Sequence, residues 1–375
     1  MTDLRPLGDF LDSLMDCGIP GADAVVMRDH EIIYRHQAGW RDREAGGKLR
    51  GDELYFMYSC SKPVTVTAAM QLLERGRFLL SDPLCEYLPE FRDMLVKGPD
   101  GCLLRAKKPI LIGHLFSMTA GFDYDLHSPA LEAMKRETQG RCPTREVARA
   151  IAKGPLSFEP GARWQYSLCH DVLAALVEAV SGERFADYVK EHIFDPLGMT
   201  RSAFHMTPGT EGQFARQYRY SDERRAAEPV ALKAEHVLGP EHDSGGAGVV
   251  SCVADYARFA DAMACGGVGA TGERILSGAA IDLMRENQLD EAQLKDFNWP
   301  QLLGYGYGLG VRTMMNRAAG GSLSSVGEFG WGGAAGAYLM IDPGNRLSVF
   351  YAQHMLNNKE PYVHPRIRNI VYGCL

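Results

Sequence analysis

A serine and a lysine stand three positions apart at Ser59 and Lys62, in the run Ser-Cys-Ser-Lys. Side chains at this spacing share one face of a helix, so the two can form a hydrogen bond. A serine hydroxyl becomes a nucleophile when a base lies beside it. The pair alone is weak evidence, because a capping serine followed by a solvated lysine has the same spacing.

The next residue, Pro63, places this pair at the start of a helix. Its ring would clash with the carbonyl of Ser59, and it has no N–H to serve a helix interior. The periodic segment 64–74 stops before Gly76, so we predict a helix that begins near Ser59. At a helix N-terminus, free N–H groups and the helix dipole can stabilise an oxyanion.

A second motif, Trp-Gln-Tyr-Ser-Leu-Cys-His-Asp at 164–171, precedes a strongly periodic segment. A tyrosine held in a cleft beside a lysine loses its proton more readily than its free pKa of about 10 suggests, so Tyr166 could take a proton from a serine. Read in isolation, Tyr166 is a core aromatic residue, Asp171 a cap of the following helix, and His170 a packing residue.

A third motif, Phe-Gly-Trp-Gly-Gly-Ala-Ala-Gly at 329–336, leads into an apolar strand. Glycines let a backbone approach a ligand closely or mark a bulge. A strand edge of this kind can offer an N–H to a carbonyl oxygen, and Trp331 can wall an apolar pocket. A plain glycine-rich turn is the competing interpretation.

The elements that must position these motifs are of two kinds. Strands are predicted near both chain ends, with helices between them. The predicted helices are 9–15, 64–74, 171–180, 185–194, 255–264 and 365–372, and the predicted strands are 24–27, 32–35, 336–341 and 347–352. This order favours an α+β protein with a sheet domain built from 1–75 and 245–375. The mainly helical domain 76–244 is inserted, with the active site in the cleft between the two.

Composition excludes several classes of function. The 375 residues carry 40 Lys plus Arg against 47 Asp plus Glu, a net charge of −7, and 46% of them are hydrophobic. With no basic run, neither nucleic acid nor an anionic membrane surface is expected as the main partner. No apolar run reaches the roughly 18 residues of a membrane span, and the start lacks a secretion signal, so we expect a cytoplasmic protein. The oligomeric state stays open.

The nine cysteines are widely spaced and include no Cys-x-x-Cys, which fits neither a disulfide framework nor a zinc cluster. Cys60 and Cys169 lie within the motifs, so we expect the site to be sensitive to thiol reagents. The runs Glu-His at 235–236 and Glu-His-Asp at 241–243 bring potential metal ligands together, but Pro240 between them favours a solvated loop. We expect no metal and no organic cofactor.

The order and spacing of the three motifs resemble the serine β-lactamase / penicillin-binding superfamily over nearly the whole chain. The flanking segments that share this resemblance are 56–63, 80–83, 160–167, 196–199 and 245–251. Tyr-Ser-Leu-x-x-Asp at 166–171 and Trp-Gly-Gly at 331–333 look similar to the class C β-lactamase-like esterases, called family VIII carboxylesterases. The resemblance implies a β-lactamase-like fold, in which an antiparallel sheet is flanked by helices and carries an inserted helical domain.

The resemblance also implies roles for individual residues. Ser59 would be the nucleophile, Lys62 would keep it poised, and Tyr166 would relay its proton to the leaving group. The N–H groups of Ser59 and Ala334 would form the oxyanion hole. Contacts to the substrate would come from Trp331, Gly332 and Gly333.

Departures from the family pattern bear on the substrate. β-Lactamases of this type carry an Asn where this chain has Leu168, and a Lys-Thr-Gly where it has Trp331-Gly332-Gly333. The cation that would pair with a β-lactam carboxylate is missing there, so a carboxylesterase of small neutral esters is the preferred reading. A β-lactamase, a D-amino-acid peptidase or amide hydrolase, and an acyltransferase are alternatives with the same chemistry. A binding protein on a retired hydrolase scaffold is the alternative from a different class.

Overall fold

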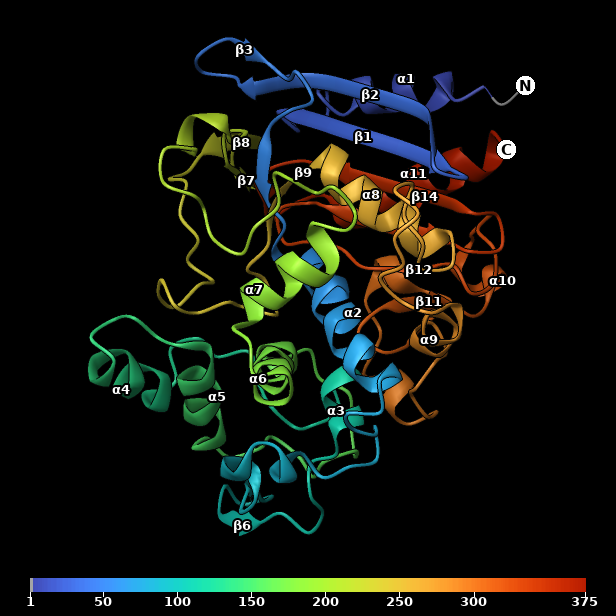
Figure 1. The fold of residues 1–375 in the computed structure, drawn as a ribbon. Coiled ribbons are helices and arrows are strands. Elements are labelled where there is room, and N and C mark those ends of the chain that lie inside the picture. The colour runs from blue at the N-terminus through green and yellow to red at the C-terminus, as the bar shows by residue number, and fades with distance from the viewer. Residues whose placement is uncertain (1–2) are drawn as a thin grey trace.

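The computed structural model describes residues 3–375 (Figure 1). Its main feature is an antiparallel sheet of eight strands in the order β10-β11-β12-β13-β14-β1-β2-β3. The strands are β1 Gly21–Arg28, β2 Glu31–Asp42, β3 Gly47–Lys48, β10 Tyr305–Tyr307, β11 Arg312–Met314, β12 Phe329–Gly330, β13 Tyr338–Asp342 and β14 Leu347–Ala352. The two chain ends therefore meet where β1 pairs with β14.

The N-terminal hairpin is confirmed and is longer than predicted. Its turn consists of Asp29 and His30, whose φ angles are 52° and 69°. Two successive residues with positive φ match the twist of the flanking strands, so β1 and β2 continue well beyond 24–27 and 32–35. At the other end, β13 begins two residues later than expected, because Gly336 has a φ of 92° and belongs to the preceding turn.

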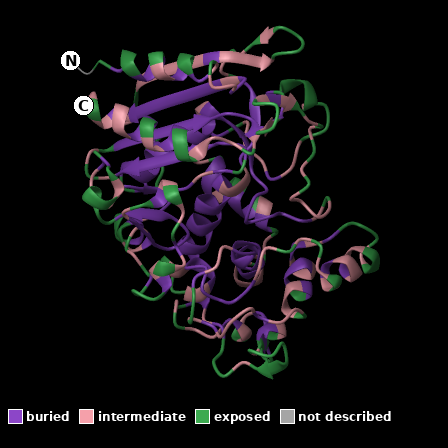
Figure 2. Ribbon diagram, turned by 180° about the vertical axis from the view of Figure 1, so that it is seen from behind, coloured by how far each residue is buried: buried purple, intermediate pink, exposed green. Residues whose placement is uncertain are grey.

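The sheet lies between two layers of helices. Ala24 and Val26 of β1 pack in a core that includes helices α1 (Arg5–Ser13) and α11 (Glu360–Gly373). The alternate residues Val25 and Met27 face a larger core that includes α2 (Ser61–Glu74) and α8 (Val253–Ala264). Figure 2 shows the sheet as a buried band with these helices around it. The α+β fold with an antiparallel sheet flanked by helices is thus confirmed.

The regular structure in the middle of the chain is mainly helical, with long irregular segments between the helices (Figure 1). The remaining helices are α3 Ile112–Phe116, α4 Pro129–Glu137, α5 Thr144–Ala152, α6 Cys169–Ser181, α7 Phe185–Val189, α9 Gly278–Met284 and α10 Arg317–Gly320. The short strands are β4 Leu54–Phe56, β5 Leu95–Lys97, β6 Leu103–Arg105, β7 Tyr218–Ser221, β8 Ala226–Pro229, β9 Val250–Cys252 and β15 Met355–Leu356. Within residues 3–375, no helix has the length and apolar character needed to cross a membrane. The domain boundaries at 75 and 245 stay a prediction.

Two helix boundaries differ from those predicted. The segment expected as one helix over 185–194 is α7 followed by a π-helical turn at Lys190–Phe194. The last helix begins at Glu360 rather than near Pro365, so Pro365 lies inside it. The buried side chains Val363 and Ile367 lie on either side of this proline in the core under the sheet. Their burial outweighs the hydrogen bond that the proline removes.

The expectation of a solvated loop at 241–243 is wrong. His242 and Asp243 are 1% and 0% exposed. The Asp243 carboxylate accepts hydrogen bonds from Arg184 Nε at 2.9 Å and lies 2.7 Å from His205 Nε2. These partners come from distant parts of the chain, so local sequence could not reveal that the loop is buried.

A buried ionic network joins the far edge of the sheet to α11. Arg312 Nη2 lies 3.0 Å from Glu328 Oε1 and also donates to the carbonyl of Leu339 at 3.0 Å. The other Glu328 oxygen accepts the Tyr305 hydroxyl, and that hydroxyl accepts a 2.8 Å hydrogen bond from Arg368 Nη1. Arg312 and Glu328 are 2% and 0% exposed, so each charge depends on the other.

We predict that Glu328→Gln lowers the free energy of unfolding by about 3–5 kcal/mol, because it leaves the Arg312 guanidinium buried without its counter-charge. Urea unfolding followed by circular dichroism measures this loss. The matched control is Glu228→Gln, which breaks the exposed pair with Arg224 and is expected to cost less than about 1 kcal/mol. Equal effects of the two substitutions would contradict the structural role of the buried pair.

Candidate active site

Ser59 lies in a 3₁₀ turn, Tyr58–Cys60, immediately before α2. The residue before it, Tyr58, has a φ of 47°, a left-handed conformation that is uncommon for a residue with a side chain. The Tyr58 hydroxyl accepts a 2.6 Å hydrogen bond from Gln217, and its ring lies 4.5 Å from that of His236. These contacts hold the strained turn that presents Ser59 at the helix start. The predicted helix start is confirmed; the strain at Tyr58 had no signal in the sequence.

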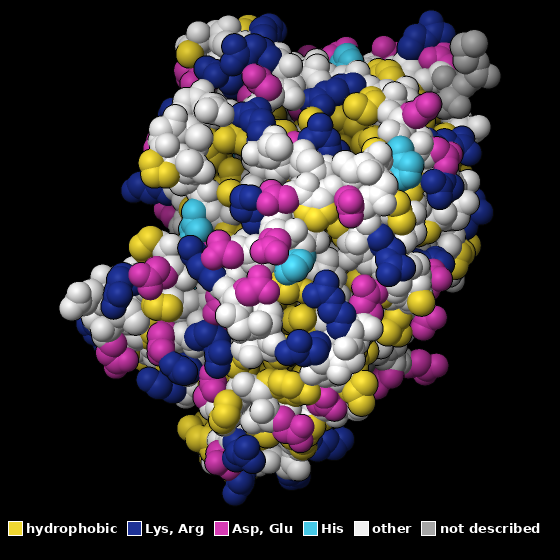
Figure 3. Space-filling view, viewed as in Figure 1, with side chains coloured by type: hydrophobic (Ala, Val, Ile, Leu, Met, Phe, Trp, Pro, Cys, Tyr) yellow, Lys and Arg dark blue, Asp and Glu magenta, His cyan; other side chains and the backbone are white. Residues whose placement is uncertain are grey.

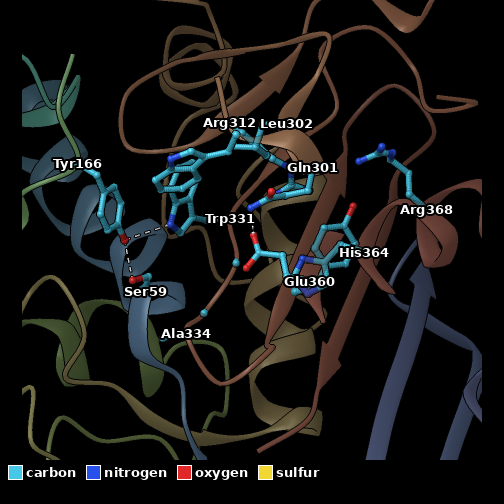
Figure 4. A pocket seen from close by; sticks show the side chains of 14 residues that line it. Ser59, Tyr166, Gln301, Leu302, Arg312, Trp331, Ala334, Glu360, His364 and Arg368 are labelled. Atoms are coloured by element: carbon cyan, nitrogen blue, oxygen red, sulfur yellow. Dashed lines mark hydrogen bonds between the residues drawn. The ribbon is translucent and has the colours of Figure 1, made fainter. Parts of the chain in front are cut away.

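The three predicted catalytic side chains converge. The hydroxyl oxygens of Tyr166 and Ser59 lie 2.6 Å apart and share a hydrogen bond. Lys62 Nζ lies 3.3 Å from the same Ser59 oxygen. Figure 4 shows Tyr166 pointing at Ser59 from the neighbouring chain segment. The serine oxygen therefore has a proton acceptor and a cation within reach, which is the geometry that nucleophilic attack requires.

The Lys62 ammonium is fully buried. It donates a 2.7 Å hydrogen bond to the carbonyl of Gly246, and it lies 4.5 Å above the Tyr166 ring. Burial by itself would lower the pKa of Lys62, but Tyr124, Tyr166 and the Asp171 carboxylate outweigh it, so the pKa is raised. These neighbours therefore favour the charged form of Lys62 beside the nucleophile.

Asp171 does not cap the helix that follows it, as the sequence suggested. The N-cap of α6 is Leu168, and Asp171 lies in the first turn of the helix. Its buried carboxylate accepts a 2.7 Å hydrogen bond from the Ser244 hydroxyl and a longer one, 3.4 Å, from the N–H of Gly246. Asp171 thereby positions the loop whose carbonyl holds Lys62. His170 is fully buried within the same helix, in agreement with a packing role.

The glycine-rich segment after β12 runs against the residues that precede Ser59. A Cβ atom at Gly333 would come within 2.5 Å of the Met57 carbonyl oxygen, so only glycine permits this approach. The Trp331 indole stacks on Tyr166 with 5.7 Å between ring centres, and its N–H donates to the Tyr166 oxygen at 3.4 Å. The exposed Ala334 N–H has no hydrogen-bond acceptor within residues 3–375. It is therefore free to bind a substrate oxygen.

A cavity of about 180 Å³ opens beside Ser59, with Tyr166 and the Trp331–Ala334 segment on its wall (Figure 4). Several lining residues were not anticipated: Trp299, Gln301, Leu302, Arg312, Tyr338, Glu360, His364 and Arg368. Three of them, Glu360, His364 and Arg368, are spaced four residues apart. This spacing places them on one face of α11 and is the signal that could have found them. No such pattern marks Trp299 or Leu302.

Leu168, the residue that replaces the family asparagine, does not face this cavity. It packs in a separate small core with Leu131 and Val147, under α4 and α5. The ring next to Tyr166 is instead that of Tyr124, which stacks on it at 5.5 Å with an interplanar angle of 4°. Burial raises the pKa of Tyr124 to about 12 despite the nearby Lys62 ammonium. Tyr124 is a neighbour of the site that the sequence did not indicate.

Convergent groups of potential metal ligands lie elsewhere. Ligand atoms of His30, Asp261 and Cys265 come close together, as do those of Glu183, Glu191 and His192. Neither group lines the cavity beside Ser59. Neither group includes the residues 235–236 or 241–243 considered from the sequence.

A serine hydrogen-bonded to a tyrosine beside a buried lysine, at the start of a helix that packs in the core against an antiparallel sheet, defines a serine hydrolase of the β-lactamase type. The chain belongs to the Beta-lactamase family, whose model matches residues 7–371. The resemblance read from the motifs is thereby confirmed, and so is the assignment as an enzyme.

Relatives and solved structures agree with this membership. Esterase EstB from Burkholderia gladioli is 31% identical over 361 residues, which cover 91% of this chain and 87% of EstB. The structure of EstCE1, described as a hydrolase with promiscuous acyltransferase activity, superposes with a TM-score of 0.80 at 27% identity and covers 99% of this chain and 98% of EstCE1. Simvastatin synthase (LovD) from Aspergillus terreus shares the fold, with a TM-score of 0.82 at 21% identity over 100% of this chain and 99% of LovD.

The structure contradicts the expected thiol sensitivity, because Cys60 and Cys169 are both fully buried. Burial raises the pKa of the Cys169 thiol to about 12 and raises that of Cys60 as well, so both stay protonated and unreactive at neutral pH.

We predict that iodoacetamide modifies the exposed Cys102 first and leaves hydrolase activity intact. Peptide mass spectrometry of the folded protein measures this order. Alkylation of Cys60 or Cys169 before Cys102 would contradict it, and the urea-unfolded protein is the control.

Proposed function

We propose that the protein is a carboxylesterase that cleaves small neutral esters through an acyl-enzyme on Ser59. The proposal rests on one observation above all, the 2.6 Å contact between the Ser59 and Tyr166 oxygens beside the buried Lys62 ammonium. The same arrangement argues against a retired scaffold, because each of the three side chains is present and within reach of the others.

The chemistry follows from this geometry. Ser59 Oγ attacks the ester carbonyl carbon while Tyr166 relays a proton: the Tyr166 oxygen takes the serine proton as its own hydroxyl proton moves to the leaving-group oxygen. The Lys62 ammonium stabilises the negative charge that develops on Ser59 Oγ as the proton leaves. The carbonyl oxygen, now an oxyanion, accepts hydrogen bonds from the N–H groups of Ser59 and Ala334. Collapse breaks the bond to the leaving group, which departs as the alcohol. Water then attacks the acyl group by the same path in reverse, which frees the acid and restores Ser59.

Several features support an ester over a β-lactam or a peptide. The position of the family lysine is occupied by Trp331, and that ring and Trp299 line the cavity. Arg312 and Arg368 also line it, but Glu328 pairs with Arg312 and the Tyr305 hydroxyl accepts a hydrogen bond from Arg368. The relative named esterase EstB supports the same preference. Esters also need less leaving-group protonation than amides.

We predict that Ser59→Ala abolishes hydrolysis of p-nitrophenyl acetate and labelling by a fluorophosphonate probe, since the acyl acceptor is gone. Tyr166→Phe should lower kcat by about 10²–10⁴-fold, because no oxygen remains to carry the proton. Lys62→Ala should lose nearly as much as Ser59→Ala, since these groups act as one unit. The measurements are steady-state kinetics and gel fluorescence.

The matched controls are Ser13→Ala, an exposed serine, and Tyr362→Phe, a partly exposed tyrosine, and both should behave as wild type. Activity that survives in Ser59→Ala would rule out the mechanism. Absence of probe labelling in both the wild type and Ser59→Ala would favour the non-catalytic binding protein.

For substrate class, we predict a kcat/KM for p-nitrophenyl butyrate that exceeds the kcat/KM for nitrocefin by at least about tenfold, because a β-lactam carboxylate finds no cation at Trp331. A panel of acyl chains from two to twelve carbons should peak at short or medium length in a cavity of about 180 Å³. Faster turnover of the β-lactam would overturn the preference for esters.

Acyl transfer is the second candidate, favoured by the description of EstCE1 as a hydrolase with promiscuous acyltransferase activity. An alcohol that competes with water for the acyl-enzyme accelerates p-nitrophenol release when deacylation limits the rate. Product analysis by mass spectrometry then separates the new ester from the free acid. A rate and product that do not change with added alcohol would exclude this function.

A further inference from the structure

The cavity beside Ser59 carries a carboxylate that the mechanism does not use. Glu360, the first residue of α11, lines the cavity, and one of its oxygens accepts a 2.6 Å hydrogen bond from Gln301 Nε2. A Cβ atom at Gly332 would lie 3.7 Å from this same oxygen. The Glu360 carboxylate is therefore beside the strand segment that borders the nucleophile. Within residues 3–375, no lysine, arginine or histidine nitrogen lies within 4 Å of it.

Aromatic rings line the same cavity as this carboxylate. Trp299 and Trp331 line the same cavity with ring centres 6.0 Å apart, and Tyr166 lies 5.4 Å from Trp299. The faces of indole and phenol rings attract cations through their quadrupole. Aromatic faces combined with a carboxylate form the kind of site that binds an ammonium group. Neutral acyl chains would need the aromatic walls but not the carboxylate.

Each positive charge near the cavity has partners of its own, although Arg312 also acts on the Glu360 carboxylate. Lys62 is engaged by the Gly246 carbonyl, and Arg312 by Glu328 and the Leu339 carbonyl. Arg368 is two helical turns beyond Glu360 on α11, about 12 Å at 1.5 Å per residue, and Figure 4 shows it on the far side of His364. Burial lowers the pKa of His364 to about 3, so its ring is neutral. Burial raises the pKa of Glu360, while the hydrogen bond from Gln301 and the nearby Arg312 favour its ionised form. Glu360 is thus the acidic group that lines the cavity beside the Trp331–Ala334 segment.

We propose that Glu360, together with Trp299 and Trp331, forms a subsite for a cationic ammonium group of the ester and disfavours a substrate carboxylate at the same place. The inference rests on the proposed cleavage of esters at Ser59 and extends its substrate class from neutral esters to esters that carry an ammonium group. A β-lactam carboxylate at the same place would approach the Glu360 carboxylate, and the arginines that line the cavity are already engaged by Glu328 and Tyr305.

The test compares esters that differ only in terminal charge. One set consists of acetate esters whose alcohol ends in a trimethylammonium group, a tert-butyl group or a carboxylate: acetylcholine, 3,3-dimethylbutyl acetate and 3-acetoxypropanoate. A second set places the same three end groups on the acyl chain of p-nitrophenyl esters. We expect the wild type to prefer the ammonium member over the tert-butyl member by about tenfold in kcat/KM in at least one set, with the carboxylate member last.

Glu360→Gln keeps the shape and the hydrogen bonding of the side chain and removes its charge. It should bring the ratio of kcat/KM for the ammonium and tert-butyl esters to about 1. Glu273→Gln removes an exposed carboxylate outside the cavity lining and should leave that ratio at its wild-type value. The inference is overturned if the wild type shows no preference for the ammonium ester, or if Glu360→Gln retains the preference.

A binding measurement separates this inference from the proposed function. Tetramethylammonium should quench the tryptophan fluorescence of the Ser59→Ala protein and bind at least about tenfold more weakly to Ser59→Ala/Glu360→Gln. If the wild type hydrolyses none of the esters, the proposed function fails while this result still supports the ammonium subsite. Equal affinity of the two proteins for tetramethylammonium would overturn the subsite, whatever the esterase result.

Discussion

The buried ammonium of Lys62 is the constraint on which the site depends. A cation without solvent contact is tolerable only where other groups supply its hydrogen bonds and counter-charge. The Gly246 carbonyl, the Ser59 hydroxyl and the rings of Tyr124 and Tyr166 surround it. These groups come from the turn before α2, from the segments before α4 and α6 and from the loop before β9. The same requirement that makes Lys62 acceptable in the interior therefore brings the nucleophile and its proton acceptor together.

The antiparallel sheet performs a second task, that of placing one wall of the cavity against Ser59. Gly333 passes so close to the Met57 carbonyl that no side chain fits, and Trp331 stacks on Tyr166. The buried pair Arg312–Glu328 and its continuation through Tyr305 tie this part of the sheet to α11. The elements that enclose the cavity are therefore held in place by buried charges. A small shift of one element against another would weaken these ionic contacts and raise the free energy of the folded protein.

The parts of the fold predicted correctly are those with strong local signals. The turn at Asp29 and His30 between two apolar runs specified a hairpin, and Pro63 after Ser59 specified a helix start. Where local and tertiary preferences compete, the prediction failed. Pro365 suggested a helix start, but burial of Val363 and Ile367 extends α11 past it.

By itself, the sequence determined the family, the antiparallel α+β architecture and the identity of the three side chains that meet at Ser59, because these depend on residue type, order and spacing along one chain. Only the tertiary structure decided which other groups surround them. Leu168, which stands at the position of the family asparagine, packs in a separate core, whereas Tyr124 and Glu360 lie at or beside the site. His242 and Asp243, expected to be solvated, are buried, and the Asp243 carboxylate pairs with Arg184. The physical reason is the same in each case: burial and charge compensation are properties of groups far apart in the chain, and no local pattern records them.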